Sequence, residues 1–289
     1  MMYDFFVAPF IEFEFMRRAF VGAFALALGG APVGVFLMLR RMSLTGDAMA
    51  HAILPGAALG FLVAGLDLFA MTIGGIVAGF TVAIGAGLIA RSTGMKEDAS
   101  LAASYLLSLA LGVLIVSLRG SNIDLLHVLF GTVLALDDAT LILLAAIATI
   151  SLFALAILWR PLVLECVDPN FLHSVSRAGA PTHLAFLALM VLNLVGGFHA
   201  LGTLLAVGIM MLPAATARFW MTDLTSMIVI AIITAILSGY IGLLVSYHSG
   251  AAAGPAIILV AGIFYAASVV LGPVGGLKRH LVPTRHLGA

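Results

Sequence analysis

Long apolar runs follow one another along almost the whole chain, separated by short polar stretches. A helix needs about 20 apolar residues, at roughly 1.5 Å each, to cross a lipid bilayer. Nine segments come close to that length, so we expect an all-α, polytopic membrane protein with about nine transmembrane helices. The predicted spans are 18–39, 44–65, 69–90, 100–118, 139–159, 182–198, 200–217, 225–246 and 254–271.

Two further segments depart from this pattern. Segment 121–137 is apolar in its middle but short, which predicts a re-entrant or interfacial helix. Segment 160–181 is the longest polar stretch, and it predicts a short helix on the cytoplasmic face that begins near Asp168-Pro169 and ends at Gly179. Asp before Pro favours a helix start, and Gly favours a stop. We expect this helix to be a docking element; a plain amphipathic surface helix is the alternative.

Composition strengthens the membrane interpretation. The 289 residues are 63% hydrophobic and 9% charged, with a mean hydropathy of +1.23. A soluble domain of this length would need much more polar surface, so we expect one transmembrane domain over 1–289 in a lipid bilayer. The net charge of zero gives no basic surface for nucleic acid. Cys166 is the single cysteine, which excludes an internal disulfide.

The positive charges orient the predicted spans. If the C-terminus is cytoplasmic, nine spans place the N-terminus outside. Cytoplasmic segments then hold ten of the thirteen Lys and Arg residues, which agrees with the positive-inside rule. The three that fall outside are Arg17, Arg18 and Arg119.

The second predicted span contains an acid and an imidazole in the stretch SLTGDAMAHAILPG, residues 43–56. Asp47 and His51 are four residues apart, so they share one helix face. Counted from Arg41, they lie roughly 9 Å and 15 Å into the membrane. A carboxylate at that depth costs several kcal/mol unless it meets water, a partner or an ion. We therefore expect Asp47 to face the interior of the bundle.

Pro55 follows four residues after His51 and cannot donate a hydrogen bond to the His51 carbonyl. The sequence therefore predicts a helix break at Pro55, with flexibility added by Gly56. Broken helices near the midplane are typical of transport sites. A carboxylate, an imidazole and a freed carbonyl together suit a divalent cation. The alternatives are that Asp47 caps the span and that His51 is an ordinary interior histidine.

Two more histidines are candidate metal ligands. His199 follows Gly196-Gly197, where we expect a turn that dips into the membrane and brings His199 one or two helical turns above His51. It would then complete the site or line its entrance. His248 is expected at the outer rim, where it could capture metal.

Motifs for nucleotide binding and hydrolysis are missing from the sequence. No G-x-x-x-x-G-K-[ST] loop occurs, and neither H-E-x-x-H nor G-x-S-x-G is present. We therefore expect a permease without enzymatic activity and without a permanently bound cofactor, driven by a separate motor subunit.

At this point the sequence resembles the permease subunits of bacterial zinc/manganese/iron ABC importers, the ZnuB/TroC-like family, over nearly its whole length. The motifs that carry the resemblance are LRRMSLTGDAMAHAILPGAALGFL (39–62), VDPNFLHSVSRAGAP (167–181), ALGTLLAVGIMMLPAATARFW (200–220) and SYHSGAAAGPAIILVAGIFY (246–265).

The resemblance implies a multi-pass protein of the bacterial plasma (inner) membrane. It further implies a homodimer of permeases, a cytoplasmic ABC ATPase dimer, and an extracytoplasmic metal-binding protein. Asp47 and His51 would line the ion path, and the form of the motif around His199 is similar to one subgroup. The stretch 167–181 would be the segment that docks on the ATPase, with the coupling residues Asp168, Pro169, Phe171, Arg177 and Gly179.

The expected function is ATP-driven import of a divalent metal ion. Zinc is expected first and manganese next, since imidazole ligands favour zinc mildly and both ions accept His and carboxylate. Iron is also possible for the family. Three alternatives stay open: a self-contained proton-coupled carrier that uses Asp47, an intramembrane enzyme built on Asp47 and His51, and an ABC permease for an iron chelate.

Overall fold

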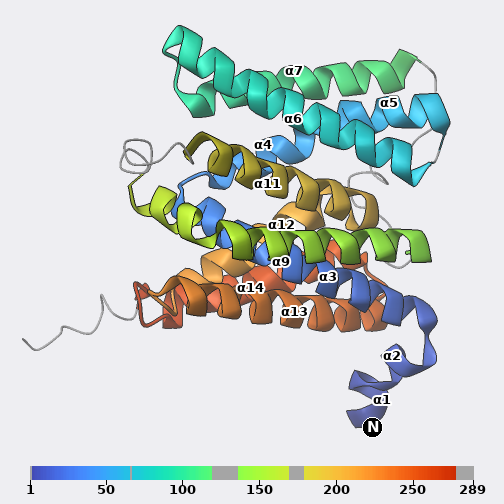
Figure 1. The fold of residues 1–289 in the computed structure, drawn as a ribbon. Coiled ribbons are helices and arrows are strands. Elements are labelled where there is room, and N and C mark those ends of the chain that lie inside the picture. Colours follow the sequence, from blue (N-terminus) through green and yellow to red (C-terminus); the bar gives the residue numbers. More distant parts are fainter. Residues whose placement is uncertain (1, 66, 119–135, 169–178, 278–289) are drawn as a thin grey trace, which may run out of the picture.

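The computed structural model describes residues 2–65, 67–118, 136–168 and 179–277, and within these ranges it contains helices and connections but no strand (Figure 1). The helices are α1 (Met2–Phe6), α2 (Ala8–Glu12), α3 (Glu14–Leu39), α4 (Ser43–Ala52), α5 (Leu54–Ala64), α6 (Leu68–Thr93), α7 (Glu97–Leu118), α9 (Asp138–Val167), α11 (Gly179–Leu201), α12 (Thr203–Arg218), α13 (Leu224–Ser249) and α14 (Ala253–Leu271).

The predicted spans coincide with helices of the described chain. Seven helical segments, one of which combines α4 and α5, are long and apolar enough to cross a membrane. Two shorter apolar helices, Ala99–Ile115 and Thr203–Arg218, fall on the two remaining predicted spans. The all-α, multi-span prediction is therefore confirmed. The re-entrant helix expected at 121–137 lies almost wholly outside the described residues.

One predicted boundary was wrong. The polar stretch expected at 160–181 does not begin as a connection, because α9 continues through Arg160 and Pro161 as far as Val167. The short helix expected from Asp168-Pro169 to Gly179 lies almost wholly outside the described residues, and Gly179 is the first residue of α11. An aliphatic run after Pro161 carries the helix onward, with Leu162 fully buried.

Local sequence explains where several helices begin. The carboxylates of Asp67, Asp137 and Asp223 each accept the backbone N–H of the residue three positions on, at 2.7, 3.0 and 2.9 Å. An Asp at this N-cap position satisfies one of the amides that a helix start leaves without a partner. These caps fix the starts of α6, α9 and α13.

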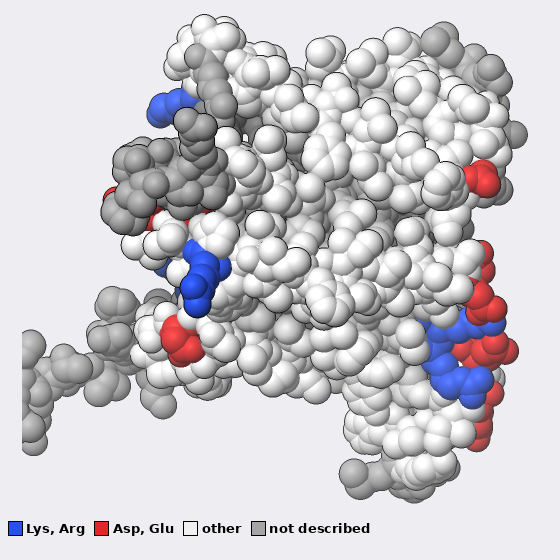
Figure 2. Space-filling model, viewed as in Figure 1, with Lys and Arg blue, Asp and Glu red and all other residues white. Residues whose placement is uncertain are grey.

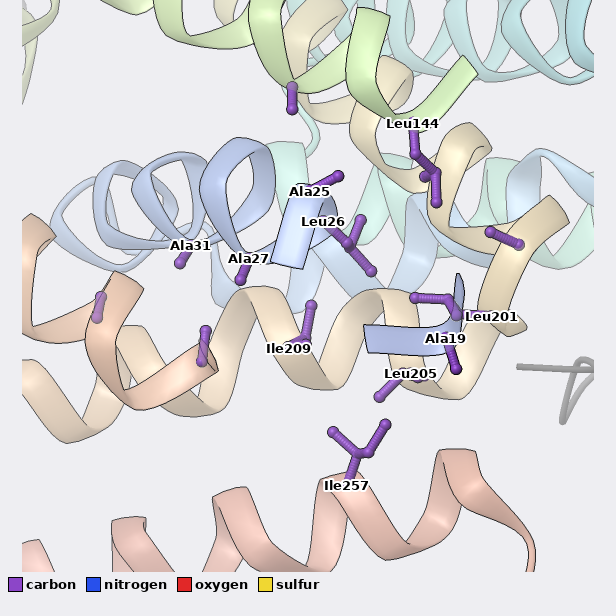
Figure 3. Close-up of a cluster of buried hydrophobic side chains, with 14 of the residues drawn as sticks. Ala19, Ala25, Leu26, Ala27, Ala31, Leu144, Leu201, Leu205, Ile209 and Ile257 are labelled. Carbon is purple, nitrogen blue, oxygen red and sulfur yellow. The ribbon is translucent and has the colours of Figure 1, made fainter. Parts of the chain in front are cut away.

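Helix α3 occupies the middle of the bundle. It packs on α9, α11, α12 and α13, while α5, α6 and α7 form a separate group at one side and α13 and α14 lie at the other (Figure 1). Small residues bring α3 close to its neighbours: a Cβ at Gly34 would collide with the backbone carbonyl of Met210 on α12. Alanines of α3 belong to one buried cluster with branched side chains of α12 and α14, such as Ile209 and Ile257 (Figure 3).

Charged side chains lie at the two ends of the helices, and an uncharged band separates them (Figure 2). One end holds a cluster in which Arg18 pairs with Glu14 at 2.7 Å and with Asp138 at 3.0 Å. The opposite end of α3 leads through Arg40 and Arg41 into α4. This distribution is the one expected for a bundle that crosses a bilayer.

Candidate metal-transport site

The predicted helix break is present. Helix α4 ends at Ala52 and α5 begins at Leu54, so Pro55 lies in the first turn of α5, where a proline is tolerated. The break frees a carbonyl that a side chain then satisfies: the Ser108 hydroxyl on α7 donates to the Ala52 carbonyl at 3.0 Å. Sequence reasoning did not single out Ser108, and its only signal was a polar residue within an apolar span.

Small residues hold the broken segment tightly. A Cβ at Gly56 would overlap the backbone carbonyl of Gly74 on α6, and a Cβ at Gly112 on α7 would lie 3.1 Å from Pro55. The second half of the broken span is therefore locked between α6 and α7. A crevice of about 540 Å³ opens beside it; Pro55 and Gly56 line it, and Asp47 and His51 do not.

Helix α4 has one buried face and one open face. Ala48, Met49 and Ala52 are buried against the bundle. Leu44 is 77% exposed and the Asp47 side chain 66% exposed, and His51 lies one turn beyond Asp47 on the same stripe. The expectation that Asp47 faces the interior of its own bundle was wrong. The small and apolar residues of α4 occupy that face, so the carboxylate points away from it.

The two candidate ligands are close together. Nε2 of His51 lies 3.9 Å from a carboxylate oxygen of Asp47. Metal–oxygen and metal–nitrogen bonds of about 2.0–2.2 Å let one cation bridge atoms up to about 4.4 Å apart. The imidazole also stacks on the ring of Tyr105 from α7, with centroids 6.3 Å apart. Nε2 and the carboxylate are thus available to the same ion.

The pair does not form a complete cation site by itself. Among the described residues no group of three or more His, Cys, Asp or Glu side chains could hold a metal ion. The His51 side chain is 29% exposed, and its Nδ1 atom is buried without a hydrogen-bond partner in the described part of the chain. Asp47 and His51 therefore supply two candidate ligands, which lie on the exposed side of α4.

The structure places His199 differently from the expectation. Helix α11 runs without a break through Gly196 and Gly197 to Leu201, and the chain turns at Gly202, where φ is +85°. The expected turn at 196–199 was wrong because the glycines serve close packing: a Cβ at Gly197 would overlap the Ala206 side chain. The side chain of His199 lies outside the described part of the structure.

His248 contacts the N-terminal helix rather than the Asp47–His51 pair. Its ring lies flat on Phe5 with centroids 4.0 Å apart, and Nε2 is 3.2 Å from the Phe5 carbonyl. Tyr240, two turns earlier on α13, donates its hydroxyl to the Phe6 carbonyl at 2.7 Å. In this arrangement His248 holds α1 against α13.

The predicted coupling residues are described only in part. Asp168 follows the last turn of α9 and is exposed, and its backbone N–H bonds the Leu164 carbonyl at 2.9 Å. Gly179 begins α11. The other three predicted coupling residues, Pro169, Phe171 and Arg177, lie outside the described residues.

Comparisons with known proteins are consistent with this geometry. The family model described as "ABC 3 transport family" matches residues 12–272. The manganese import system permease protein ScaB of Streptococcus parasanguinis is 32% identical over 93% of this chain and 95% of its own length. The manganese transport system membrane protein MntC of Listeria monocytogenes is 30% identical over 94% and 96%.

A solved structure has the same fold. PsaBC from Streptococcus pneumoniae, solved in complex with Fab, superposes with a TM-score of 0.86 at 30% sequence identity, covering 98% of this chain and 100% of the matched chain. The match covers the broken span and both flanking helix groups.

Proposed function

The chain belongs to the ABC 3 transport family, a family of membrane permeases, and from that premise we propose that it is the membrane-spanning subunit of an ATP-driven importer whose cargo passes Asp47 and His51. The observation that supports this proposal is the exposed position of the Asp47–His51 pair. A carboxylate and an imidazole lie 3.9 Å apart on the exposed face of a broken membrane span. A divalent cation can replace part of its hydration shell with a carboxylate oxygen and an imidazole nitrogen, and these ligands offset the free energy of dehydration.

A second copy of the chain completes the site in this proposal. An exposed carboxylate within a membrane span is costly unless something polar covers it. Two copies related by a two-fold axis would face each other through the stripe of Leu44, Asp47 and His51. The pathway between them then has two carboxylates and two imidazoles, which is enough for a four-ligand cation site.

Membership of the family and the distribution of charge (Figure 2) support the partners and the orientation in this proposal. The end of the bundle with Arg40, Arg41, Lys96 and Arg218 faces the cytoplasm, and the end with α1 and α2 faces outward. A cytoplasmic ABC ATPase dimer docks at the segment 168–179, and an extracytoplasmic metal-binding protein delivers the cation at the opposite end. ATP-driven closure of the ATPases then opens the Asp47–His51 level inward.

Manganese is the cargo we propose first. The relatives named above are manganese permeases, and a carboxylate that is 66% exposed suits a hard, readily hydrated ion. Zinc is the second candidate, because imidazole and carboxylate together also suit zinc. A chelated iron complex already has its coordination positions filled, so it would gain less than a bare ion from direct bonds to the carboxylate and the imidazole.

The test is uptake by reconstituted vesicles that contain the chain, its ATPase and its binding protein. We expect ATP-dependent entry of manganese that exceeds entry of zinc and iron. Asp47→Ala and His51→Ala should each lower uptake at least about tenfold at equal membrane abundance, since each removes a ligand from the pathway. Thr149→Ala is the matched control. It alters an exposed hydroxyl on α9 that bonds only its own helix.

Each outcome of this experiment distinguishes between the alternative functions. Uptake without ATP would favour a self-contained carrier. Normal ATP-driven uptake by both alanine variants would keep the importer and remove Asp47 and His51 from the ion path. Preferential zinc entry would keep the site and change the cargo.

A further inference from the structure

A largely buried cluster of charged and polar side chains joins three helices at the end of the bundle where α9 ends and α11 begins. Arg40 follows α3, Glu165 lies in the last turn of α9, and His183 lies in the first turns of α11. One guanidinium nitrogen of Arg40 is 2.5 Å from Oε1 of Glu165 and 2.6 Å from Nδ1 of His183. His183 Nδ1 is also 3.4 Å from the same carboxylate oxygen.

The ion pair of the cluster is shielded from solvent, whereas the His183 side chain is 22% exposed. The Arg40 and Glu165 side chains are 8% and 5% exposed, and the guanidinium lies 4.7 Å above the ring of Phe186. Charges so deeply buried are held in place because separation would leave each without compensation. The three helix ends are therefore fastened to one another by a strong, directional contact.

The three residues of the cluster lie close in sequence to the predicted docking segment and to helix α4. Glu165 precedes the segment 168–179 by three residues, and His183 follows it by four. Arg40 is separated from α4 by only two residues, Arg41 and Met42. Both ends of that segment are thus fastened to the residue that leads into the helix of Asp47 and His51.

We propose that Arg40, Glu165 and His183 are positioning residues that transmit movement of the end of α9 and the start of α11 to helix α4, and so couple ATP hydrolysis to opening of the cation site. This inference rests on the proposed function. The last turn of α9, the first turns of α11 and the start of α4 then move as one unit, because displacing Arg40 or Glu165 alone would leave a buried charge without its partner.

In this proposal the Glu165 carboxylate also has a second arrangement, which would use its other oxygen. Oε1 of Glu165 meets both Arg40 and His183, whereas Oε2 is buried and has no hydrogen-bond partner in the described part of the chain. A small shift of α9 along α3 would let the guanidinium engage both oxygens, as Arg–carboxylate pairs often do. Two discrete arrangements of one buried network are what a switching element requires.

The experiment measures metal ions imported per ATP hydrolysed by the complete reconstituted importer. Glu165→Gln keeps the size and one acceptor oxygen but removes the charge. We expect it to lower the transport-to-hydrolysis ratio at least about fivefold while hydrolysis continues, which lies in the usual range of coupling between sites. Glu165→Asp, which keeps the charge, should recover part of the ratio.

A matched control separates coupling from stability. Asn193 on α11 donates to the Ser151 hydroxyl on α9 at 2.7 Å, so Ser151→Ala removes a buried polar contact between two helices that also hold the cluster. Ser151 lies about 21 Å from Glu165 along α9. Ser151→Ala should leave the ratio unchanged. If it lowers the ratio as much as Glu165→Gln does, the cluster has no special role and the proposal is overturned.

A second variant covers the case in which Glu165→Gln fails to assemble. Arg40→Met combined with Glu165→Met replaces the buried pair by apolar side chains of similar length, a change that proteins often tolerate. This double variant should assemble and hydrolyse ATP with the same low ratio. A wild-type ratio in the double variant would overturn the proposal.

A third readout does not depend on the cargo. Leu44→Cys in a Cys166→Ala background reports the ATP-dependent accessibility of α4 to a maleimide. We expect an ATP-dependent change in the otherwise wild-type protein and none with Glu165→Gln added; the same change in both would overturn the relay. If Asp47→Ala retains full uptake while Glu165→Gln abolishes this change, the cation-site assignment fails and the relay stands.

Discussion

Arg41 has the backbone conformation that most residues avoid. Its φ is +58°, and it is the only described non-glycine residue with a positive φ. The Met42 N–H bonds the Leu37 carbonyl at 2.9 Å and the Arg41 N–H bonds the Met38 carbonyl at 3.1 Å. These two bonds form a Schellman motif, in which glycine is the usual residue at the left-handed position. An arginine at this position therefore carries backbone strain.

Replacing Arg41 by glycine should relieve that strain. We expect Arg41→Gly to raise the free energy of unfolding by about 0.5–1 kcal/mol, because the left-handed conformation is unfavourable for residues with a Cβ. The thermal midpoint of the purified protein in detergent measures the effect. Arg41→Ala removes the same charge but keeps the Cβ, so it should bring no gain; equal midpoints for the two variants would contradict the explanation.

At the scale of helices, the broken second span depends on close backbone contact. Gly56 of α5 and Gly74 of α6 approach so closely that a Cβ on either would collide with the carbonyl of the other. The α5–α6 pair therefore has no room for a larger residue at the crossing, and the position of Pro55 depends on it.

Gly56→Ala should lower the free energy of unfolding of the bundle by at least about 3 kcal/mol, the upper end of the usual cost of overpacking. The added methyl group meets rigid backbone rather than a movable side chain. The yield of monodisperse protein and its thermal midpoint would show the loss. Gly85→Ala on α6 is the matched control, since a Cβ there meets nothing within 4 Å. It should be neutral or slightly stabilising; a similar loss in both variants would refute the steric explanation.

The Asp residues at helix starts make a pH-dependent contribution to the stability of the folded protein. The Asp223 carboxylate accepts hydrogen bonds from Ser226, which lower the pKa of the Asp223 carboxyl below its ordinary value of 3.8. A lowered pKa in the folded state means that the cap stabilises α13 fully above the unfolded pKa. That stabilisation is lost as the pH falls through the lower, folded pKa.

The thermal midpoint of the wild type should therefore exceed that of Asp223→Ala at pH 7, and the difference should shrink below about pH 4. Asp223→Asn keeps a neutral cap, so its advantage over alanine should not depend on pH. A wild-type advantage that is constant down to pH 3 would show that the charged cap is not responsible.

At the scale of the whole molecule, helix α4 has one face that the rest of the chain leaves exposed. Asp47 is 66% exposed and Leu44 77% exposed on a helix whose other face is buried. Helix α14 lies on the far side of the bundle (Figure 1). Pairing of two copies through α4 would cover the carboxylate and bring two half-sites together.

Cross-linking tests this arrangement. Leu44→Cys in a Cys166→Ala background should form a dimer with a short bifunctional thiol reagent in native membranes, because the two-fold axis would bring both copies of residue 44 together. The Leu259 side chain on α14 is also largely exposed, at 69%, but Leu259→Cys should not cross-link. Efficient cross-linking through residue 259 and none through residue 44 would place the interface elsewhere.

The sequence by itself determined the elements of this protein. Span length follows from the bilayer thickness, so nine apolar runs predicted the helices to within a few residues, except at the end of α9, which continues to Val167. Proline has no N–H, so Pro55 predicted the break between α4 and α5. The helical repeat placed Asp47 and His51 on one stripe. All three depend on properties local to a few residues.

Only the tertiary structure decided which faces meet. It turned Asp47 outward, continued α11 through Gly196-Gly197, and gave the Ala52 carbonyl its partner on α7. It also joined Arg40 to Glu165 and His183, which are 125 and 143 residues away along the chain. No local pattern encodes such contacts, because they depend on how small residues let whole helices approach one another.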